Sequence, residues 1–213
     1  MSKKNSSVIL KEEFKNYSDI SKIYLSLNKK LNSLKKKIFL VALSGGPDSL
    51  ALTALTKAYS YNNKCKIYYV LIDHNLRKNS SNEAQAVKKL LKRHKITLNI
   101  LTNKKQIDKN IQSKAREIRY NLLINFCKQK KIKTILTAHN LEDLVETFFI
   151  RLSRGSGLQG LSSIKQINKI DNNVTLLRPL LDCKKIYLIK VSKIIFGKYY
   201  KYPTNDNRKY LRT

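Results

Sequence analysis

The stretch Ile38-Phe-Leu-Val-Ala-Leu-Ser-Gly-Gly-Pro-Asp-Ser49 decides the fold. Six apolar residues run without interruption from Ile38 to Leu43, a pattern typical of a strand buried on both faces of a parallel sheet. The run stops at Ser-Gly-Gly, and apolar residues at helical spacing follow over 48–59. The segment therefore predicts a buried strand, a glycine turn and a helix. Loop amides and a helix N-terminus in this arrangement can bind an anion such as a phosphate.

Outward from this stretch, short apolar runs alternate with helical periodicity along the whole chain. This alternation predicts the α/β class, with a Rossmann-like parallel five-stranded sheet and helices on both faces. Ligands of such a fold bind at the carboxyl ends of the strands. The other expected strands are Lys66–Ile72, Ile96–Leu101, Thr134–Ala138 and Val174–Leu177, and the other expected helices are Asp19–Leu34, Asn82–His94, Gln112–Lys130, Leu141–Leu152 and Lys184–Phe196.

Length and composition narrow the class of protein. The 213 residues suit a single domain, 1–213, of which 1–35 form an N-terminal helical extension. No apolar run approaches the ~20 residues of a membrane span, and the N-terminus is no secretory signal, so we expect a cytoplasmic protein without a membrane partner. Three cysteines stand far apart without a CxxC pair, which argues against disulfides and against a cysteine-bound metal.

The net charge of +30 is extreme for this length. A field of that sign attracts phosphates and indicates a polyanionic partner such as RNA. Compositional drift in a lysine- and asparagine-rich chain explains the charge equally well, so the two interpretations stay open. The arginines are more informative, because the planar guanidinium suits phosphates in a way that lysine cannot copy.

Five of the six glycines lie in two loops. The first, Ser44-Gly45-Gly46-Pro47-Asp48-Ser49, predicts an ATP site in which Asp48 holds Mg²⁺ against the phosphates. The alternative is that Asp48 merely caps the helix and that the glycines form an ordinary turn. The second loop, with Gly155, Gly157 and Gly160, matches GxGxxG by letter but follows a helix, so it is not a dinucleotide fingerprint. We expect a flexible basic loop, with Arg151 and Arg154, at the mouth of the site.

SGGPDS after a buried strand resembles the signature of the N-type ATP pyrophosphatases, or PP-loop enzymes. The remaining motifs resemble those of one family within this group, the tRNA(Ile)-lysidine synthetases, over nearly the whole of 38–212. These motifs are Asp73-His-Asn-Leu-Arg77, Ala115-Arg-Glu-Ile-Arg-Tyr120, Ala138-His-Asn-Leu-Glu-Asp143 with Glu146, Arg151–Leu161, Arg178-Pro-Leu180 and Pro203–Arg212.

The resemblance implies a two-step ligase reaction. ATP adenylates the C2 carbonyl oxygen of the wobble cytidine in tRNA(Ile) with a CAU anticodon, and pyrophosphate leaves. The ε-amine of free lysine then attacks C2 and expels AMP, which leaves lysidine in the tRNA. The substrates implied are therefore ATP with Mg²⁺, free lysine and this tRNA; nothing in the sequence indicates the oligomeric state.

The same resemblance distributes roles among the polar residues. Asp48, Arg116 and the loop amides are expected to stabilise the charge on the α-phosphate. His139, Asp143 and Glu146, spaced by four and three, are expected on one helix face, where they bind lysine and where Asp143 touches Mg²⁺; a plain solvated face is the alternative. Arg116 with Arg119 could likewise be a solvated face, and Asp73-His74 a capping turn. The residues expected to contact tRNA are Arg151, Arg154, Gly155, Gly157, Arg178 and Arg212.

The sequence departs from the family pattern at two places, and two alternative functions remain open. Glu142-Asp143 stands where the family usually has paired aspartates, and the chain stops at Thr213, where the family continues into C-terminal tRNA-binding modules. A fragment and a minimal enzyme both fit the second departure. The nearest rival is a 2-thiocytidine-type sulfur-inserting tRNA enzyme, which the missing CxxC disfavours. The other rival is a non-catalytic RNA-binding remnant, against which the intact Asp48, Arg116, Asp143 and Glu146 argue.

Overall fold

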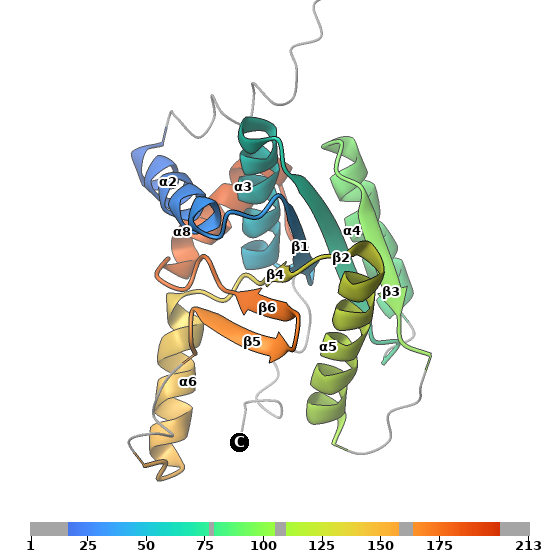
Figure 1. Cartoon of the computed structure of the whole chain (residues 1–213), viewed down its shortest axis with the longest axis vertical. Coiled ribbons are helices and arrows are strands. Elements are labelled where there is room, and N and C mark those ends of the chain that lie inside the picture. Colours follow the sequence, from blue (N-terminus) through green and yellow to red (C-terminus); the bar gives the residue numbers. More distant parts are fainter. Residues whose placement is uncertain (1–16, 77–78, 105–109, 158–163, 201–213) are drawn as a thin grey trace, which may run out of the picture.

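A computed structural model describes residues 17–76, 79–104, 110–157 and 164–200. The predicted α/β architecture is confirmed: helices cover both faces of a largely parallel sheet (Figure 1). The strands are β1 (Ile38–Leu43), β2 (Lys66–Asp73), β3 (Leu98–Thr102), β4 (Thr134–Leu136), β5 (Ile167–Asp171) and β6 (Val174–Leu177). The helices are α2 (Ser18–Ser33), α3 (Pro47–Asn63), α4 (Ser80–Arg93), α5 (Ile111–Lys130), α6 (Leu141–Ser153) and α8 (Lys185–Phe196).

The sheet has six strands in the order β3-β2-β1-β4-β6-β5, one more than predicted. The additional strand, β5, is antiparallel to β6 and forms the edge of the sheet, whereas the other five are parallel. The sequence of β5 did not reveal it because three of its five residues are exposed and its apolar residues form no run. A hairpin partner at an edge needs only one covered face, so its hydrophobic pattern is weak.

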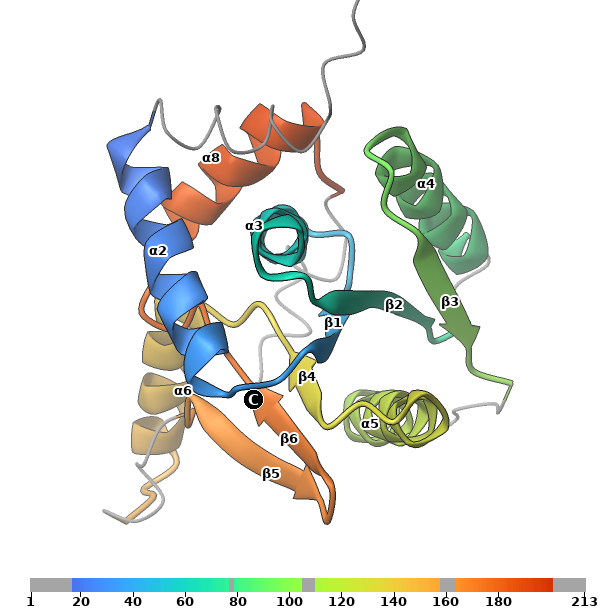
Figure 2. The ribbon, with the colours of Figure 1, turned by 45° about the horizontal axis from the view of Figure 1, so that its top comes forward.

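The strands bury side chains on both faces, as the apolar run of β1 predicted. Phe39 and Val41 pack in a large core with α2, α3, α4 and α8, whereas Leu40 packs in a second core against α5. Figure 2 shows α3 and α5 on opposite sides of the sheet. The central helix, α3, has ten buried residues among seventeen. Such a helix is apolar on nearly all sides because the sheet and α8 cover it.

All three cysteines are at least half-buried. Cys127 and Cys183 are buried, Cys65 is half-buried, and all three are free thiols. Burial raises the pKa of Cys127 and Cys183 to about 12 and that of Cys65 to about 11. Thiols in this state are unreactive. Among the described helices, none is both long and apolar enough to cross a lipid bilayer.

Candidate active site

The loop between β1 and α3 is wound around a single hydroxyl group. Ser49 Oγ accepts hydrogen bonds from the amides of Ser44 (3.3 Å) and Gly45 (3.1 Å) and donates one to the carbonyl of Gly46 (2.9 Å). Gly45 has a φ of 87°, a conformation that a side chain disfavours, so glycine is needed here. Pro47 occupies the first helical turn, where its missing N–H leaves no donor unsatisfied. The sequence pattern Ser-Gly-Gly-Pro-x-Ser thus encodes this turn.

The first turn of α3 keeps amide donors available for an anion. Its N-cap, Gly46, supplies no side-chain acceptor. The first N–H groups of a helix have no intrahelical partner, so the amides of Asp48 and Ser49 point out of the helix end. These amides lie at the carboxyl end of β1, where the fold class predicts a ligand. The geometry suits a phosphate group at this helix end.

Asp48 does not cap its own helix, because the N-cap is Gly46 and no side chain caps it, so the capping role offered as an alternative is not observed. Its Oδ1 atom is buried and has no hydrogen-bond partner among the described residues. Burial raises the pKa of the carboxyl from 3.8 to about 6; the nearby Lys185 ammonium opposes this increase, and the Asp143 carboxylate adds to it. A buried, unpaired carboxylate beside another acid is costly unless a cation or donor joins it. Asp48 is therefore suited to a bound cation.

The start of α6 faces Asp48. Asn140 and Asp143 form a capping box: the Asn140 side chain accepts from the Asp143 amide, and Asp143 Oδ2 accepts from the Asn140 amide, both at 3.0 Å. This arrangement holds the Asp143 carboxylate at the helix end near Asp48. The Nδ2 group of Asn140 is buried without a partner among the described residues, and Asn140 lowers the pKa of Asp48. The amide of Asn140 and the carboxylate of Asp48 therefore lie close to each other.

The predicted helix face of three residues is only partly present. His139 precedes α6, which begins at Leu141, so it does not share a helix face with Asp143 and Glu146. The Nδ1 atom of His139 lies 3.0 Å from Thr137 Oγ1. The capping box explains the difference, because the chain at Asn140 must be extended for the side chain to reach back to the helix amide. Glu146 is exposed on α6, and Asp143 is half-buried.

Positive charges gather on the neighbouring side, around α5. The Arg116 and Arg119 guanidinium groups lie over the ring of Tyr120, at 5.2 and 5.6 Å from its centroid. Arg178, directly after β6, is buried, and its Nη1 donates to the carbonyl of Lys165 (2.7 Å). Burial lowers the pKa of Arg178, and the Arg116 guanidinium adds to this while Tyr120 opposes it. Arg116, Tyr120 and Arg178 therefore lie in one region of the structure.

His74 belongs to the same positive region. Burial and the Arg119 guanidinium lower its pKa, and its Nδ1 is buried without a partner among the described residues. The residue before it, Asp73, accepts the amide of Asn75 through Oδ1 (2.9 Å), so its carboxylate forms the turn that the sequence offered as an alternative. The site thus has a carboxylate side, around Asp48, and a cationic side, around Arg178.

The glycine loop predicted at the mouth lies at the other end of α6. Arg154 follows the last turn of α6. The whole helix is about 20 Å long at 1.5 Å per residue. Gly155, with a φ of 66°, ends the helix: its amide bonds to Leu152 and the next amide bonds to Arg151. This Schellman arrangement explains the first glycine. Gly157 is exposed, and Gly160 and Arg212 lie outside the described residues.

Two residues near Asp48 were not singled out from the sequence. Asn140 stands inside a quoted motif, and its signal was the N-cap position before an apolar helix. Lys185 had no sequence signal, because one lysine in a lysine-rich chain is uninformative. Its amide donates to Glu142 Oε2 (2.8 Å), which fixes the start of α8 against α6. Only the packing of these two helices brings Lys185 to Asp48.

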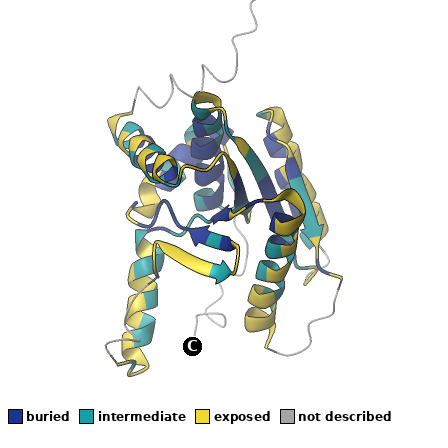
Figure 3. Ribbon diagram, in the orientation of Figure 1, coloured by how far each residue is buried: buried dark blue, intermediate teal, exposed yellow. Residues whose placement is uncertain are grey.

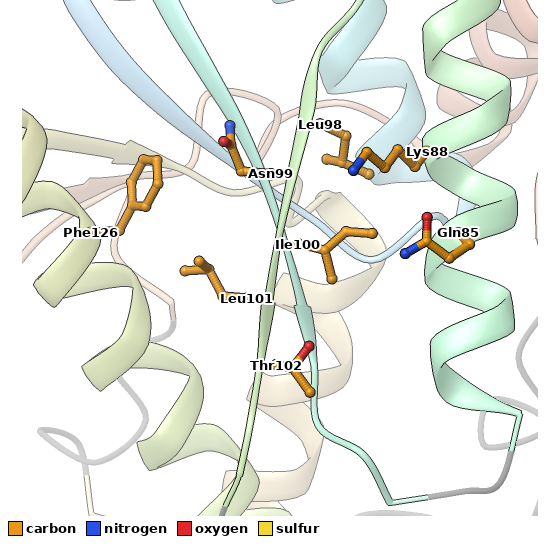
Figure 4. Close-up of a pocket in the computed structure, with 8 residues that line it drawn as sticks. All are labelled: Gln85, Lys88, Leu98, Asn99, Ile100, Leu101, Thr102 and Phe126. Atoms are coloured by element: carbon orange, nitrogen blue, oxygen red, sulfur yellow. The ribbon is translucent and has the colours of Figure 1, made fainter.

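The pocket in Figure 4 is separate from this site. Its volume is about 410 Å³, and it lies along the edge strand β3, where Gln85, Lys88 and Phe126 contribute to its walls. None of the predicted site residues lines it. Within the part of the chain that the structure describes, no group of three or more His, Cys, Asp or Glu side chains is arranged to hold a metal ion.

Comparison with known proteins identifies the family. Residues 20–213 match the PP-loop domain family. The chain belongs to the PP-loop family. Membership implies that the chain uses ATP, in agreement with the phosphate-binding loop predicted at Ser44–Ser49. A U34-tRNA thiolase from Methanococcus maripaludis, with a [4Fe-4S] cluster, superposes with a TM-score of 0.72 at 20% identity, over 87% of this chain and 67% of that one. At this identity the likeness shows the fold alone.

Three relatives share one name, tRNA(Ile)-lysidine synthase. The chain is 42% identical over 176 residues to a tRNA(Ile)-lysidine synthase of Orientia tsutsugamushi, which covers 81% of this chain and 39% of that protein. A synthase of Wolbachia pipientis wMel is 37% identical, with 81% and 41% coverage, and one of Rickettsia rickettsii is 33% identical, with 90% and 40% coverage. The predicted resemblance is confirmed, and the chain spans about two fifths of these relatives' length.

Proposed function

We propose that this PP-loop domain is the adenylating part of a tRNA(Ile)-lysidine synthase. In this reaction ATP adenylates the C2 carbonyl oxygen of the wobble cytidine in a CAU anticodon, with release of pyrophosphate. The ε-amine of lysine then forms the bond to C2, AMP leaves, and the amine loses a proton. The observation that carries the proposal is the buried Oδ1 atom of Asp48, which has no hydrogen-bond partner among the described residues, beside the first turn of α3 in a chain similar to synthases of this name.

The first step needs negative charge to be stabilised on the α-phosphate. The free amides at the start of α3 supply donors in a fixed direction, and Arg116 and Arg178 supply guanidinium groups near one another. Preorganised donors of this kind are worth several kcal/mol where water is excluded. Asp48, together with Asp143, would hold Mg²⁺, which fits the orphaned Oδ1 atom and the raised pKa of Asp48. A bound Mg²⁺ neutralises phosphate charge as pyrophosphate leaves.

The second step needs lysine to bind as a cation and to react as a neutral amine. Glu146, exposed on α6 one turn after Asp143, is suited to bind the ammonium group, and His139 beside Thr137 is suited to accept its proton. Glu146 lies on α6, whereas Arg116 lies on α5, so groups of opposite charge come from different helices. This division of charge lets one site bind an anion and a cation at once.

The sulfur-inserting alternative is less compatible with the side chains. Sulfur transfer and cluster binding need accessible thiolates, whereas burial raises the pKa of all three thiols in this chain to about 11 or 12. Two of these thiols, Cys127 and Cys183, pack in the hydrophobic cores. The lysine-transferring reaction needs no thiol.

Incorporation of labelled lysine into RNA tests the proposal. The protein is incubated with ATP, Mg²⁺, labelled lysine and a tRNA that carries a CAU anticodon; the same tRNA with a UAU anticodon is the control. We expect label in the first tRNA only, and Asp48→Asn should abolish both label and pyrophosphate release while tRNA affinity changes less than two-fold. Asp182→Asn, on the surface outside the site, is the matched control and should keep activity. No label with the folded protein would contradict the proposed function.

A further inference from the structure

The exposed face of α6 is the most unusual surface of the described residues. None of its thirteen residues is buried, although the sequence has apolar residues at helical spacing. Figure 3 shows exposed and half-buried residues along the length of α6, and Figure 1 shows that the helix extends beyond the body formed by the sheet. The side chains concerned are those of Val145 (45% exposed), Phe148 (38%), Phe149 (60%) and Leu152 (49%).

These four side chains lie on one face of the helix, because they follow one another at steps of three, one and three. We call this surface the α6 apolar face. The rings of Phe148 and Phe149 contact each other edge to face, with centroids 5.7 Å apart. An exposed apolar patch of this kind marks an interaction site. Two aromatic rings at its centre are surfaces on which flat groups can stack.

The charge around this face indicates the kind of partner. Arg151 lies in the last turn of α6, and Arg154 follows as the exposed C-cap residue. The chain as a whole carries a net charge of +30, so a second copy would be repelled at moderate ionic strength. Aromatic rings flanked by arginines are how proteins bind single-stranded nucleic acid: the bases stack on the rings, and the guanidinium groups contact the phosphates.

The distance between the α6 apolar face and Asp48 determines how many nucleotides can connect a base at one to a base at the other. Phe149 comes nine residues after Asn140, so it lies about 13 Å along the helix from the end that faces Asp48. A stacked strand rises about 3.4 Å per nucleotide, so this distance corresponds to roughly four nucleotides. A base held beside Asp48 and a base stacked on Phe149 can therefore belong to the same loop of RNA.

From this arrangement we propose that the α6 apolar face is a stacking platform for unpaired bases of an RNA loop, with Phe149 as its main contact. The inference rests on the proposed function for the identity of the RNA, but not for the stacking itself. It gives α6 a second role: its first turn orients Asp143 toward the site, and its last two turns bind the loop whose base enters that site.

Binding of a 17-nucleotide anticodon stem-loop, measured by fluorescence anisotropy with the whole protein, tests the platform. Phe149→Leu keeps an apolar side chain but removes the ring, and Phe149→Trp keeps a ring. We expect Phe149→Leu to weaken binding by about five-fold or more, and Phe149→Trp to bind within two-fold of the unchanged protein. Ile186→Ala, which removes an exposed apolar side chain on α8, is the matched control and should have no effect. A fully paired RNA duplex of the same length should not distinguish Phe149→Leu from the unchanged protein.

Equal binding of the stem-loop by Phe149→Leu and the unchanged protein would overturn the platform. Analytical sedimentation is the second test. If the unchanged protein is dimeric at micromolar concentration and the Phe149→Asp variant is monomeric, the α6 apolar face binds a second copy of the chain instead of RNA. Failure of the lysine-incorporation assay is a separate result. If label is absent but Phe149→Leu still weakens stem-loop binding, the proposed function fails and the platform stands.

Discussion

Replacement of Asp48 by asparagine should stabilise the ligand-free protein, because burial of the ionised carboxylate opposes folding. The pKa of Asp48 is raised from 3.8 to about 6, chiefly by burial. At about 1.36 kcal/mol per pKa unit, this difference corresponds to about 3 kcal/mol as an upper limit. Asp48 keeps some contact with solvent, so we expect a gain of about 2 kcal/mol at pH 7.5 for Asp48→Asn. For a chain of this length that gain raises Tm by about 4–8 °C.

The pH dependence has a definite sign. The folded-state pKa of Asp48 is raised, so the cost of ionisation is fully present above about pH 6 and falls as the pH is lowered from 6 towards 4. The advantage of Asp48→Asn, measured by thermal unfolding followed by circular dichroism, should therefore fall to about half at pH 5 and nearly vanish at pH 4. Asp182→Asn is a control of opposite sign. The Lys30 ammonium, 2.7 Å away, lowers the pKa of Asp182, so loss of this ion pair should make the protein slightly less stable. If Asp48→Asn gives no increase at pH 7.5, or the same increase at pH 4, the reasoning on burial is wrong.

Three further predictions follow from single contacts. Gly155→Ala should cost about 1 kcal/mol, because Gly155 has a φ of 66° with open space around it, and the matched change Gly157→Ala should be neutral; hydrogen exchange in α6 reports both. Glu142→Ala should cost about 1 kcal/mol in urea unfolding because the Lys185 amide loses its acceptor, whereas Glu142→Gln should restore most of it. Arg178→Met should fold and yet weaken ATP binding about ten-fold or more in calorimetry, and unchanged affinity would exclude Arg178 from the phosphate site.

The order of elements was predictable from the sequence because each signal is local. The buried run of β1 is apolar on both faces since α3 and α5 cover both sides of it, and this requirement is visible in consecutive letters. Helix spacing likewise located all six described helices to within a few residues. The antiparallel β5 escaped because an exposed edge strand leaves no such pattern. The predicted start of α6 at Leu141 is confirmed, but His139 lies before that start and so was wrongly placed on the helix face with Asp143 and Glu146.

The sequence by itself determined the turn between β1 and α3. Gly45 is needed for its positive φ, Pro47 for the first helical turn, and Ser49 for the hydroxyl that the loop encloses, and all three constraints act within six residues. Tertiary structure alone decided what surrounds Asp48. Asn140 and Lys185 reach it from segments about 90 and 140 residues further along the chain, because parallel strands end at one edge of the sheet and α6 packs against the start of α8. Burial, and with it the raised pKa of Asp48, arises only when these elements pack together.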